Sequence, residues 1–173
     1  MDKKVLVIIP AYNEAGNIKN TIEDVAGSTS SMDILVIDDG SCDATVLQAN
    51  DAGVYVVSLP FNLGIGGAVQ TGFKYAASHM YDIVVRVDAD GQHDAKYIND
   101  LLNGITDFKA DMVIGSRFLE PISDYQSSWV RRIGIRFFAK LISFLTSCKI
   151  TDPTSGFNAF ITSIGVSSLK IVT

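Results

Sequence analysis

The chain has 173 residues, of which 47% are hydrophobic and 19% charged, and its formal net charge is −5. This length suits one domain with a full core, and the composition is that of a folded globular protein rather than a disordered one. The acidic balance argues against nucleic acid as a partner. Cys42 and Cys148 match neither a zinc-binding spacing nor a disulfide framework, so we expect a reducing compartment.

Neither a signal peptide nor a transmembrane helix is predicted. The first apolar run, residues 5–9, ends at Pro10 and is too short for the apolar core of a signal peptide. A transmembrane helix needs roughly 18 uncharged residues, and the best candidate, residues 133–150, is interrupted by charges at Arg136 and Lys140. We therefore expect a cytoplasmic protein.

Strand and helix signals alternate along the chain, which predicts βαβ units and an α/β fold with a parallel sheet. Runs rich in β-branched residues predict strands at residues 5–9, 34–37, 54–58, 83–87, 112–114 and 158–161. Helical spacing predicts helices at residues 16–26, 44–50, 67–80 and 95–108, and a last helix that Ser163 caps and that extends to Thr173.

Two carboxylates, Asp88 and Asp90, follow the predicted strand at residues 83–87, and Gln92 supplies a further oxygen. Mg²⁺ and Mn²⁺ prefer oxygen ligands, and Mg²⁺ is usually held by one or two carboxylates together with substrate phosphates. The end of a parallel strand is also where α/β sheets bind their ligands. We therefore predict that Mg²⁺ or Mn²⁺ binds here together with a diphosphate.

The loop after the first strand contains Pro10, Tyr12 and Asn13. Pro10 ends the strand because it has no N–H to donate to the sheet. Taken alone, the stretch is most simply an ordinary turn in which Asn13 caps the next helix. Tyr12 is the informative residue, since an aromatic ring at a strand end is well placed to stack on a base.

The loop after the second strand begins with Asp38 and Asp39. Adjacent carboxylates repel each other, so the two side chains should have different partners. One interpretation is a capped turn in which Ser41 or Asp43 caps the next helix. The other is that one aspartate accepts hydrogen bonds from a base or a ribose.

Three glycines, Gly64, Gly66 and Gly67, precede the third helix. They would allow a phosphate to approach the helix N-terminus, although their spacing fits neither the dinucleotide fingerprint nor a P-loop. Close packing of the helix on the sheet explains them equally well. Arg117, which follows the fifth strand, is either a surface residue or a phosphate ligand.

Residues 129–149 hold five basic residues and no acidic ones. Arg132, Arg136 and Lys140 recur every four residues beside an apolar row, which predicts a basic amphipathic helix. Such a helix either covers the core with a solvated basic edge or contacts anionic lipid head groups or a lipid phosphate.

The motifs are individually weak, but their order is specific. Pro-Ala-Tyr-Asn-Glu, Asp-Asp-Gly-Ser, Asn-Leu-Gly-x-Gly-Gly-Ala, Asp-Ala-Asp-Gly-Gln-His, Gly-Ser-Arg and Asp-Pro-Thr-Ser-Gly-Phe occur in sequence. This series resembles the family 2 glycosyltransferases, and within them the branch that uses dolichyl or polyprenyl phosphate. The resemblance implies a GT-A fold: a Rossmann-like, mostly parallel sheet with helices on both faces. It also implies a single catalytic domain with a nucleotide-sugar half at residues 1–116 and an acceptor half at residues 117–173.

The resemblance further implies a role for each motif. The nucleotide sugar would be bound by Pro10, Tyr12, Glu14, Ile37, Asp39, Asp88 and Ala89. The metal, Mg²⁺ or Mn²⁺, would be held by Asp88, Asp90 and Gln92. The acceptor phosphate would be bound by Arg117, Arg131 and Arg132, and the catalytic residues would be Asp90 and Arg117.

The implied reaction is an inverting, metal-dependent transfer of a hexose from GDP-mannose or UDP-glucose to a polyprenyl or dolichyl phosphate, at the cytoplasmic face of a membrane. Two alternatives stay open. One is a family 2 transferase with a saccharide acceptor, in which a carboxylate would serve as general base. The other is a nucleotide-sugar-binding fragment that is inactive by itself. Members of the family continue beyond the Ser-Gly-Phe segment, so we expect this chain to be truncated at its C-terminus.

Overall fold

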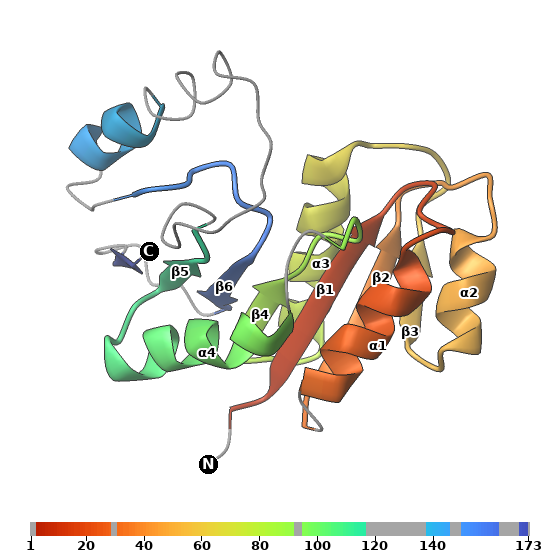
Figure 1. The fold of residues 1–173 in the computed structure, drawn as a ribbon, viewed down its shortest axis with the longest axis horizontal. Helices are drawn as coiled ribbons and strands as arrows, with labels where there is room; N and C mark the ends of the chain where they lie inside the picture. Colours follow the sequence, from red (N-terminus) through yellow and green to blue (C-terminus); the bar gives the residue numbers. More distant parts are fainter. Residues whose placement is uncertain are drawn as a thin grey trace.

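A computed structural model describes residues 3–28, 31–91, 95–116, 138–145, 150–162 and 170–172. Within them lies a sheet of seven strands in the order β3-β2-β1-β4-β6-β5-β7 (Figure 1). The strands are β1 (Val5–Ala11), β2 (Asp33–Asp38), β3 (Tyr55–Ser58), β4 (Ile83–Arg86), β5 (Met112–Ile114), β6 (Asn158–Ile161) and β7 (Ile171–Val172). The helices are α1 (Ile18–Ser28), α2 (Thr45–Asp51), α3 (Ile65–Ser78) and α4 (Ile98–Asp107), the last preceded by a 3₁₀ turn at Ala95–Tyr97.

The prediction of a mostly parallel sheet with helices on both faces is confirmed. Strands β1 to β4 run parallel to one another, whereas β6 lies antiparallel between β4 and β5. Asn158, at the start of β6, is paired with Arg86 at the end of β4 and with Ile114 at the end of β5. Because β6 is reversed, the loop that precedes it arrives at the carboxyl ends of the parallel strands.

Each face of the sheet has its own core. On one face, alternate strand residues such as Val7 and Val36 pack beneath α1 and α4. On the other face, residues such as Ile8 and Leu35 pack beneath α3. Both faces are buried, and this explains why the central strands are apolar throughout rather than alternating.

The last predicted helix is wrong in the part that the structure describes. Ile171 and Val172 form β7, which pairs in parallel with β5, and Met112 is paired with Ile171. Two β-branched residues suit a short strand that covers an otherwise open sheet edge. Ser163, the expected helix cap, lies outside the described residues.

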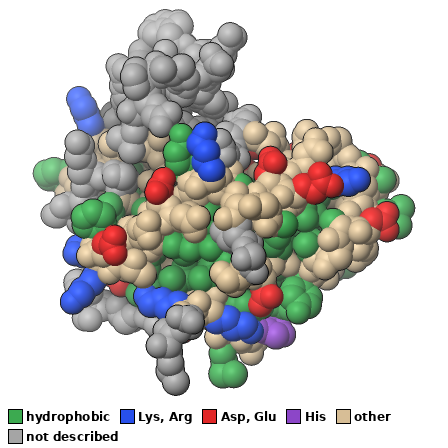
Figure 2. Space-filling model, turned by 60° about the horizontal axis from the view of Figure 1, so that its bottom comes forward, with side chains coloured by type: hydrophobic (Ala, Val, Ile, Leu, Met, Phe, Trp, Pro, Cys, Tyr) green, Lys and Arg blue, Asp and Glu red, His purple; other side chains and the backbone are tan. Residues whose placement is uncertain are grey.

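The predicted basic amphipathic helix is described only at residues 138–145, which are helical. Phe138, Phe144 and Leu145 are exposed there, whereas Ala139 is buried. Among the described residues, none of the helices has the length and apolar character needed to cross a membrane. On the face of the molecule seen in Figure 2, acidic and basic side chains are interspersed among uncharged ones.

Candidate active site

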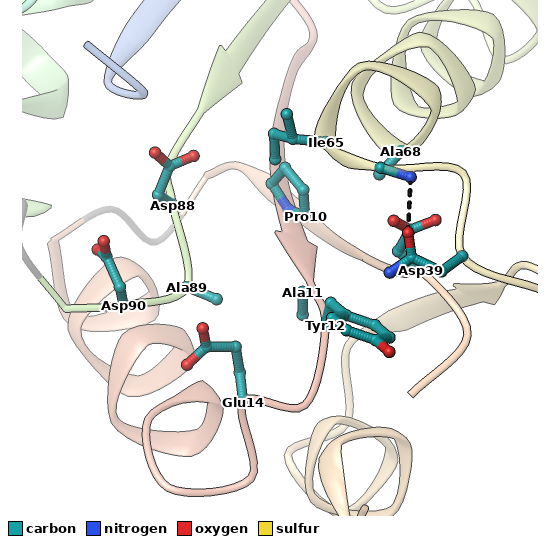
Figure 3. Close-up of a pocket in the computed structure, with 12 residues that line it drawn as sticks. Pro10, Ala11, Tyr12, Glu14, Asp39, Ile65, Ala68, Asp88, Ala89 and Asp90 are labelled. Atoms are coloured by element: carbon teal, nitrogen blue, oxygen red, sulfur yellow. Dashed lines mark hydrogen bonds between the residues drawn. The ribbon is translucent and has the colours of Figure 1, made fainter. Parts of the chain in front are cut away.

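A pocket of about 380 Å³ lies at the carboxyl ends of the parallel strands, where the loops after β1, β2, β3 and β4 meet (Figure 3). This volume falls within the range of small-molecule sites, and the position is the one at which open α/β sheets bind ligands. The lining residues are Pro10, Ala11, Tyr12, Glu14, Asp39, Asn62, Gly64, Ile65, Ala68, Asp88, Ala89 and Asp90.

The pocket has two chemically different ends. The carboxylates of Glu14, Asp88 and Asp90 lie at one end, which we call the acidic end, whereas Tyr12 and Asp39 lie together at the other (Figure 3). A hydrogen bond of 2.9 Å from Asn17 Nδ2 to Glu14 Oε2 helps to hold the Glu14 side chain. The arrangement can bind a cation at one end and a planar or hydroxyl-bearing group at the other.

Asp88 is held on both sides. The Nε and Nη2 atoms of Arg86 donate to Asp88 Oδ1 at 3.0 and 2.8 Å. On the other side, a Cβ atom built on Gly156 would lie 1.6 Å from Asp88 Oδ2, so the backbone of the loop before β6 passes directly beside this carboxylate. The Asp-Pro-Thr-Ser-Gly-Phe segment therefore borders the acidic end of the pocket.

A contact from α1 anchors the turn between the two aspartates. The buried hydroxyl of Thr21 donates to the carbonyl oxygen of Ala89 at 3.2 Å. Thr21 lies at the helical spacing of a core position, so no local signal in the sequence distinguishes it from an ordinary buried threonine. The turn that carries Asp88 and Asp90 is thus tied to α1.

The structure gives Asp38 and Asp39 separate hydrogen-bond partners, as their adjacent charges led us to expect. Asp38 Oδ1 accepts a hydrogen bond of 3.1 Å from the Ser41 N–H and shapes the turn. Asp39 lines the pocket, and its Oδ1 accepts a hydrogen bond of 2.8 Å from the Leu63 N–H. Asp39 is buried, and its hydrogen bond to the Leu63 N–H orders the loop that leads into α3. The same side chain lines the pocket.

Asn13 does not cap the first helix, contrary to our expectation. Its backbone is in the left-handed region at φ 55°, and its Oδ1 accepts a hydrogen bond of 2.9 Å from the Cys42 N–H. Its own N–H donates to Ser41 Oγ at 2.8 Å. These bonds tie the loop that carries Tyr12 to the loop after β2.

Asp43 strengthens the same connection. Its Oδ2 accepts a hydrogen bond of 3.1 Å from the Ala15 N–H, and its Oδ1 accepts one of 2.9 Å from the Thr45 N–H. The Thr45 hydroxyl also donates to Oδ1 and is the main reason that the pKa of Asp43 lies below its ordinary value of 3.8. A second hydrogen bond, from the Glu14 N–H to Thr45 Oγ1, links the network to the pocket.

Of the three glycines, Gly64 directly precedes α3, whereas Gly66 and Gly67 lie in its first turn. Gly64 lines the pocket and has a φ of 78°, a conformation that favours glycine. At Gly67 a Cβ atom would lie 2.5 Å from the Leu63 Cβ, so this glycine allows the first turn of α3 to pack against Leu63, and not against the sheet. The backbone at the start of α3 therefore approaches the ligand space closely.

Most of the predicted donor residues meet at the pocket, which Pro10, Tyr12, Glu14, Asp39, Asp88, Ala89 and Asp90 all line. Ile37 does not line it, because its side chain is fully buried in the core beneath α3, where it faces Gly72. The other predicted site residues, Gln92, Arg117, Arg131 and Arg132, lie outside the described part of the chain.

The acidic end suits a hard metal ion only in combination with a ligand. In the described parts of the chain, no three His, Cys, Asp or Glu side chains converge on a common metal position. Asp88 and Asp90 would therefore hold a metal together with phosphate oxygens and water, which is the usual mode for Mg²⁺. The donor set fits a cation that arrives with a diphosphate.

Solved structures with the same fold identify the class of protein. Glucosyl-3-phosphoglycerate synthase from Mycobacterium tuberculosis in complex with uridine diphosphate has a TM-score of 0.69 and 25% sequence identity, and the match covers 92% of this chain and 57% of that one. The structure of its complex with Mn²⁺ and UDP-glucose has the same TM-score and identity, and the match covers 92% of this chain and 56% of that one. The fold is that of a GT-A glycosyltransferase.

The sequence model for glycosyl transferase family 2 matches residues 6–164, and the chain belongs to this family. It is 32% identical over 169 residues to undecaprenyl-phosphate mannosyltransferase of Micrococcus luteus, covering 91% of this chain and 66% of that protein. It is also 32% identical over 164 residues to polyprenol monophosphomannose synthase of Mycolicibacterium smegmatis, covering 91% and 62%. The chain thus spans just under two thirds of the length of these relatives.

Proposed function

We propose that this chain forms the donor-binding part of a glycosyltransferase that moves a hexose from a nucleoside-diphosphate sugar to a polyprenyl or dolichyl phosphate. The observation that carries the proposal is the two-ended pocket, with Tyr12 and Asp39 at one end and the carboxylates of the acidic end at the other. A nucleoside diphosphate has matching parts, namely a planar base with a ribose and a metal-binding diphosphate.

At the nucleoside end, Tyr12 is 47% exposed and presents its ring to the ligand space, where a base can stack on it. The carboxylate of Asp39 would accept hydrogen bonds from the ribose or the base. Its existing bond to the Leu63 N–H holds it in place, so little side-chain ordering is needed when the donor binds.

At the diphosphate end, Asp88, Asp90 and Gln92 would hold Mg²⁺ or Mn²⁺, which supplies Lewis-acid stabilisation of the charge that develops on the leaving diphosphate. The backbone around Gly64 approaches the same space from the start of α3. Complexes of the solved relatives with Mn²⁺ and UDP-glucose support a divalent metal and a nucleotide sugar.

The acceptor would attack the sugar C1 through a phosphate oxygen from the face opposite the diphosphate, and the bond from C1 to the diphosphate oxygen would break, so the configuration at C1 would invert. A lipid phosphate is already an anion near neutral pH, so no protein base has to remove a proton. Its approach to an anionic donor requires positive charge, which Arg117, Arg131 and Arg132 would supply. The exposed apolar side chains Phe138 and Phe144 would keep this region at the membrane surface.

Calorimetric titration tests the donor site. The 173-residue chain is titrated with UDP-glucose and with GDP-mannose, each with Mn²⁺ and again with EDTA. We expect binding of one donor that requires the metal. If a folded chain binds neither donor with Mn²⁺, and a longer chain of the same protein also binds neither, the proposal is wrong.

A second candidate acceptor is a small phosphorylated acid. It is favoured by the similarity to glucosyl-3-phosphoglycerate synthase, which has been solved in complex with phosphoglyceric acid. Some relatives with at least 30% identity instead carry names that specify a polyprenyl or dolichyl phosphate, including the dolichyl-phosphate N-acetylglucosaminyltransferase of Methanococcus voltae. Transfer of label from the donor to phosphoglycerate or to a short polyprenyl phosphate separates the two candidates.

A further inference from the structure

Arg86 is a charged residue at the end of a buried strand, and the proposed reaction gives it no role. The three residues before it, Ile83, Val84 and Val85, are at most 2% exposed. The Arg86 side chain itself is only 20% exposed. Holding a charge in such a place is unfavourable unless it is paired. Its partner is Asp88, whose side chain is 27% exposed and lines the pocket.

The geometry of the sheet creates this pair. Residues two apart on an extended chain point to the same face, so Arg86 and Asp88 both lie on the face opposite Val85 and Val87. Arg86 does not line the pocket. Its paired residue on β6 is Asn158.

The contact with Arg86 restricts the Asp88 carboxylate through only one of its two oxygens. Both Arg86 donors reach the same oxygen, Oδ1, and Gly156 borders the other side near Oδ2. Within the described part of the chain, Oδ2 accepts no hydrogen bond. Arg86 therefore sets the orientation of Asp88 through one oxygen, and Gly156 packs against the carboxylate near the other.

Arg86 also changes the charge of the acidic end. Its positive charge offsets that of Asp88, which weakens the attraction of the pocket for a lone cation. The same charge weakens the repulsion between the acidic end and a diphosphate. The two effects have opposite signs, because the two ligands carry opposite charges.

We propose that Arg86 is a positioning residue that orients Asp88 and balances its charge, so that the pocket binds a divalent metal together with a nucleoside diphosphate in preference to the metal alone. This inference rests on the proposed donor site. For a partly exposed pair, removal of the charge should change each affinity by about threefold to tenfold.

The test compares the wild-type chain with Arg86→Gln by calorimetry. Mn²⁺ alone is one ligand, and UDP and GDP, each in saturating Mn²⁺, are the others. We expect Arg86→Gln to bind Mn²⁺ alone more tightly, by about threefold to tenfold, and to bind the nucleotide more weakly by a similar factor. A purely structural role for Arg86 would weaken both, because a disordered site binds neither ligand well.

Two further variants complete the experiment. Arg86→Lys keeps the positive charge, so its affinity for Mn²⁺ alone should stay within about twofold of wild type. If Arg86→Gln does not fold, the Mn²⁺ affinity of Arg86→Lys is the measurement that tests the charge-balancing role. Lys19→Gln makes the same change in charge on the exposed surface of α1, and should alter neither affinity.

The outcomes separate this inference from the donor site itself. If neither the folded wild-type chain nor a longer chain of the same protein binds either nucleotide in Mn²⁺, the donor site and this inference both fail. If wild type binds but Arg86→Gln weakens both ligands or neither, the inference is overturned and the donor site stands. A rise of threefold or more in Mn²⁺ affinity for Arg86→Lys would overturn it as well.

Discussion

The backbone of Gly156 lies so close to Asp88 that a Cβ atom at position 156 would be 1.6 Å from Asp88 Oδ2 and 2.1 Å from its carboxyl carbon. Sixty-eight residues separate the two positions in the chain, and the antiparallel insertion of β6 brings them together. Glycine is thus required at 156 for a steric reason, because any larger residue would displace the aspartate.

The first prediction follows from this contact. Gly156→Ala should move Asp88 and lower metal-dependent donor affinity by about tenfold or more, with a loss of stability of about 1–3 kcal/mol from overpacking. Calorimetry and urea unfolding measure the two effects. Gly27→Ala is the matched control, because a Cβ atom there meets nothing within 4 Å. Unchanged donor affinity in Gly156→Ala would show that the loop does not position Asp88.

A second prediction concerns the metal. Asp90→Asn should remove most of the difference in donor affinity between Mn²⁺ and EDTA, because a neutral amide is a poor ligand for a hard cation. Asp51→Asn, at the exposed end of α2, removes the same charge away from the pocket and should leave that difference intact. If Asp90→Asn retains full metal dependence, Asp90 is not a metal ligand.

Tyr12 provides a third prediction. Tyr12→Ala should weaken nucleotide binding by about tenfold, because stacking of a base on an aromatic ring contributes about 1–3 kcal/mol. Tyr12→Phe keeps the ring and should stay within about twofold of wild type. Tyr55→Ala, a change at an exposed tyrosine of β3, controls for the loss of a surface ring. Equal losses in Tyr12→Ala and Tyr12→Phe would assign the role to the hydroxyl instead.

The acceptor arginines give a fourth prediction. Arg131→Ala and Arg132→Ala should reduce transfer to a polyprenyl phosphate by about tenfold or more, since each removes a charge-assisted contact to phosphate. Donor affinity, measured by the same titration as before, should not change. An equal fall in donor affinity would mean that these residues belong to the donor site.

A fifth prediction concerns pH. The hydrogen bond from the Thr45 hydroxyl lowers the pKa of Asp43 in the folded state. The ionised Asp43 therefore stabilises the fold fully at pH values above its ordinary pKa of 3.8. That contribution is lost as the pH falls through the lowered folded-state value. Asp43→Asn should therefore lose stability at pH 7 and approach wild type as the pH falls progressively below 3.8, as measured by urea midpoints. A constant difference between the two proteins across this range would contradict the assignment.

The sequence by itself determined the fold class and the place of the site. Alternating strand and helix signals predict a parallel sheet, and the carboxyl ends of parallel strands share one edge. Tyr12, Asp39 and Asp88 could therefore be assigned to one pocket, because each lies just beyond the end of a different strand. The motif order predicts the family, which the match over residues 6–164 confirms.

Only the tertiary structure decided which side chains reach that pocket. Asp38 and Asp39 are chemically identical in the sequence, and their separate roles depend on Ser41 and on the distant Leu63 N–H. Ile37 is in the core because the alternation of the strand turns its side chain toward α3. The sequence shows periodicity and turns over a few residues, whereas these contacts depend on the order and direction in which distant strands pair.

The same reason explains the two contacts of Asp88. Arg86 is close in sequence, but its pairing is apparent only when both side chains are seen on one face of β4. Gly156 reaches Asp88 because β6 runs antiparallel between two parallel strands, a reversal that no local pattern in residues 158–161 specifies. Local chemistry determined which groups the site contains, and the long-range strand order determined how they are held.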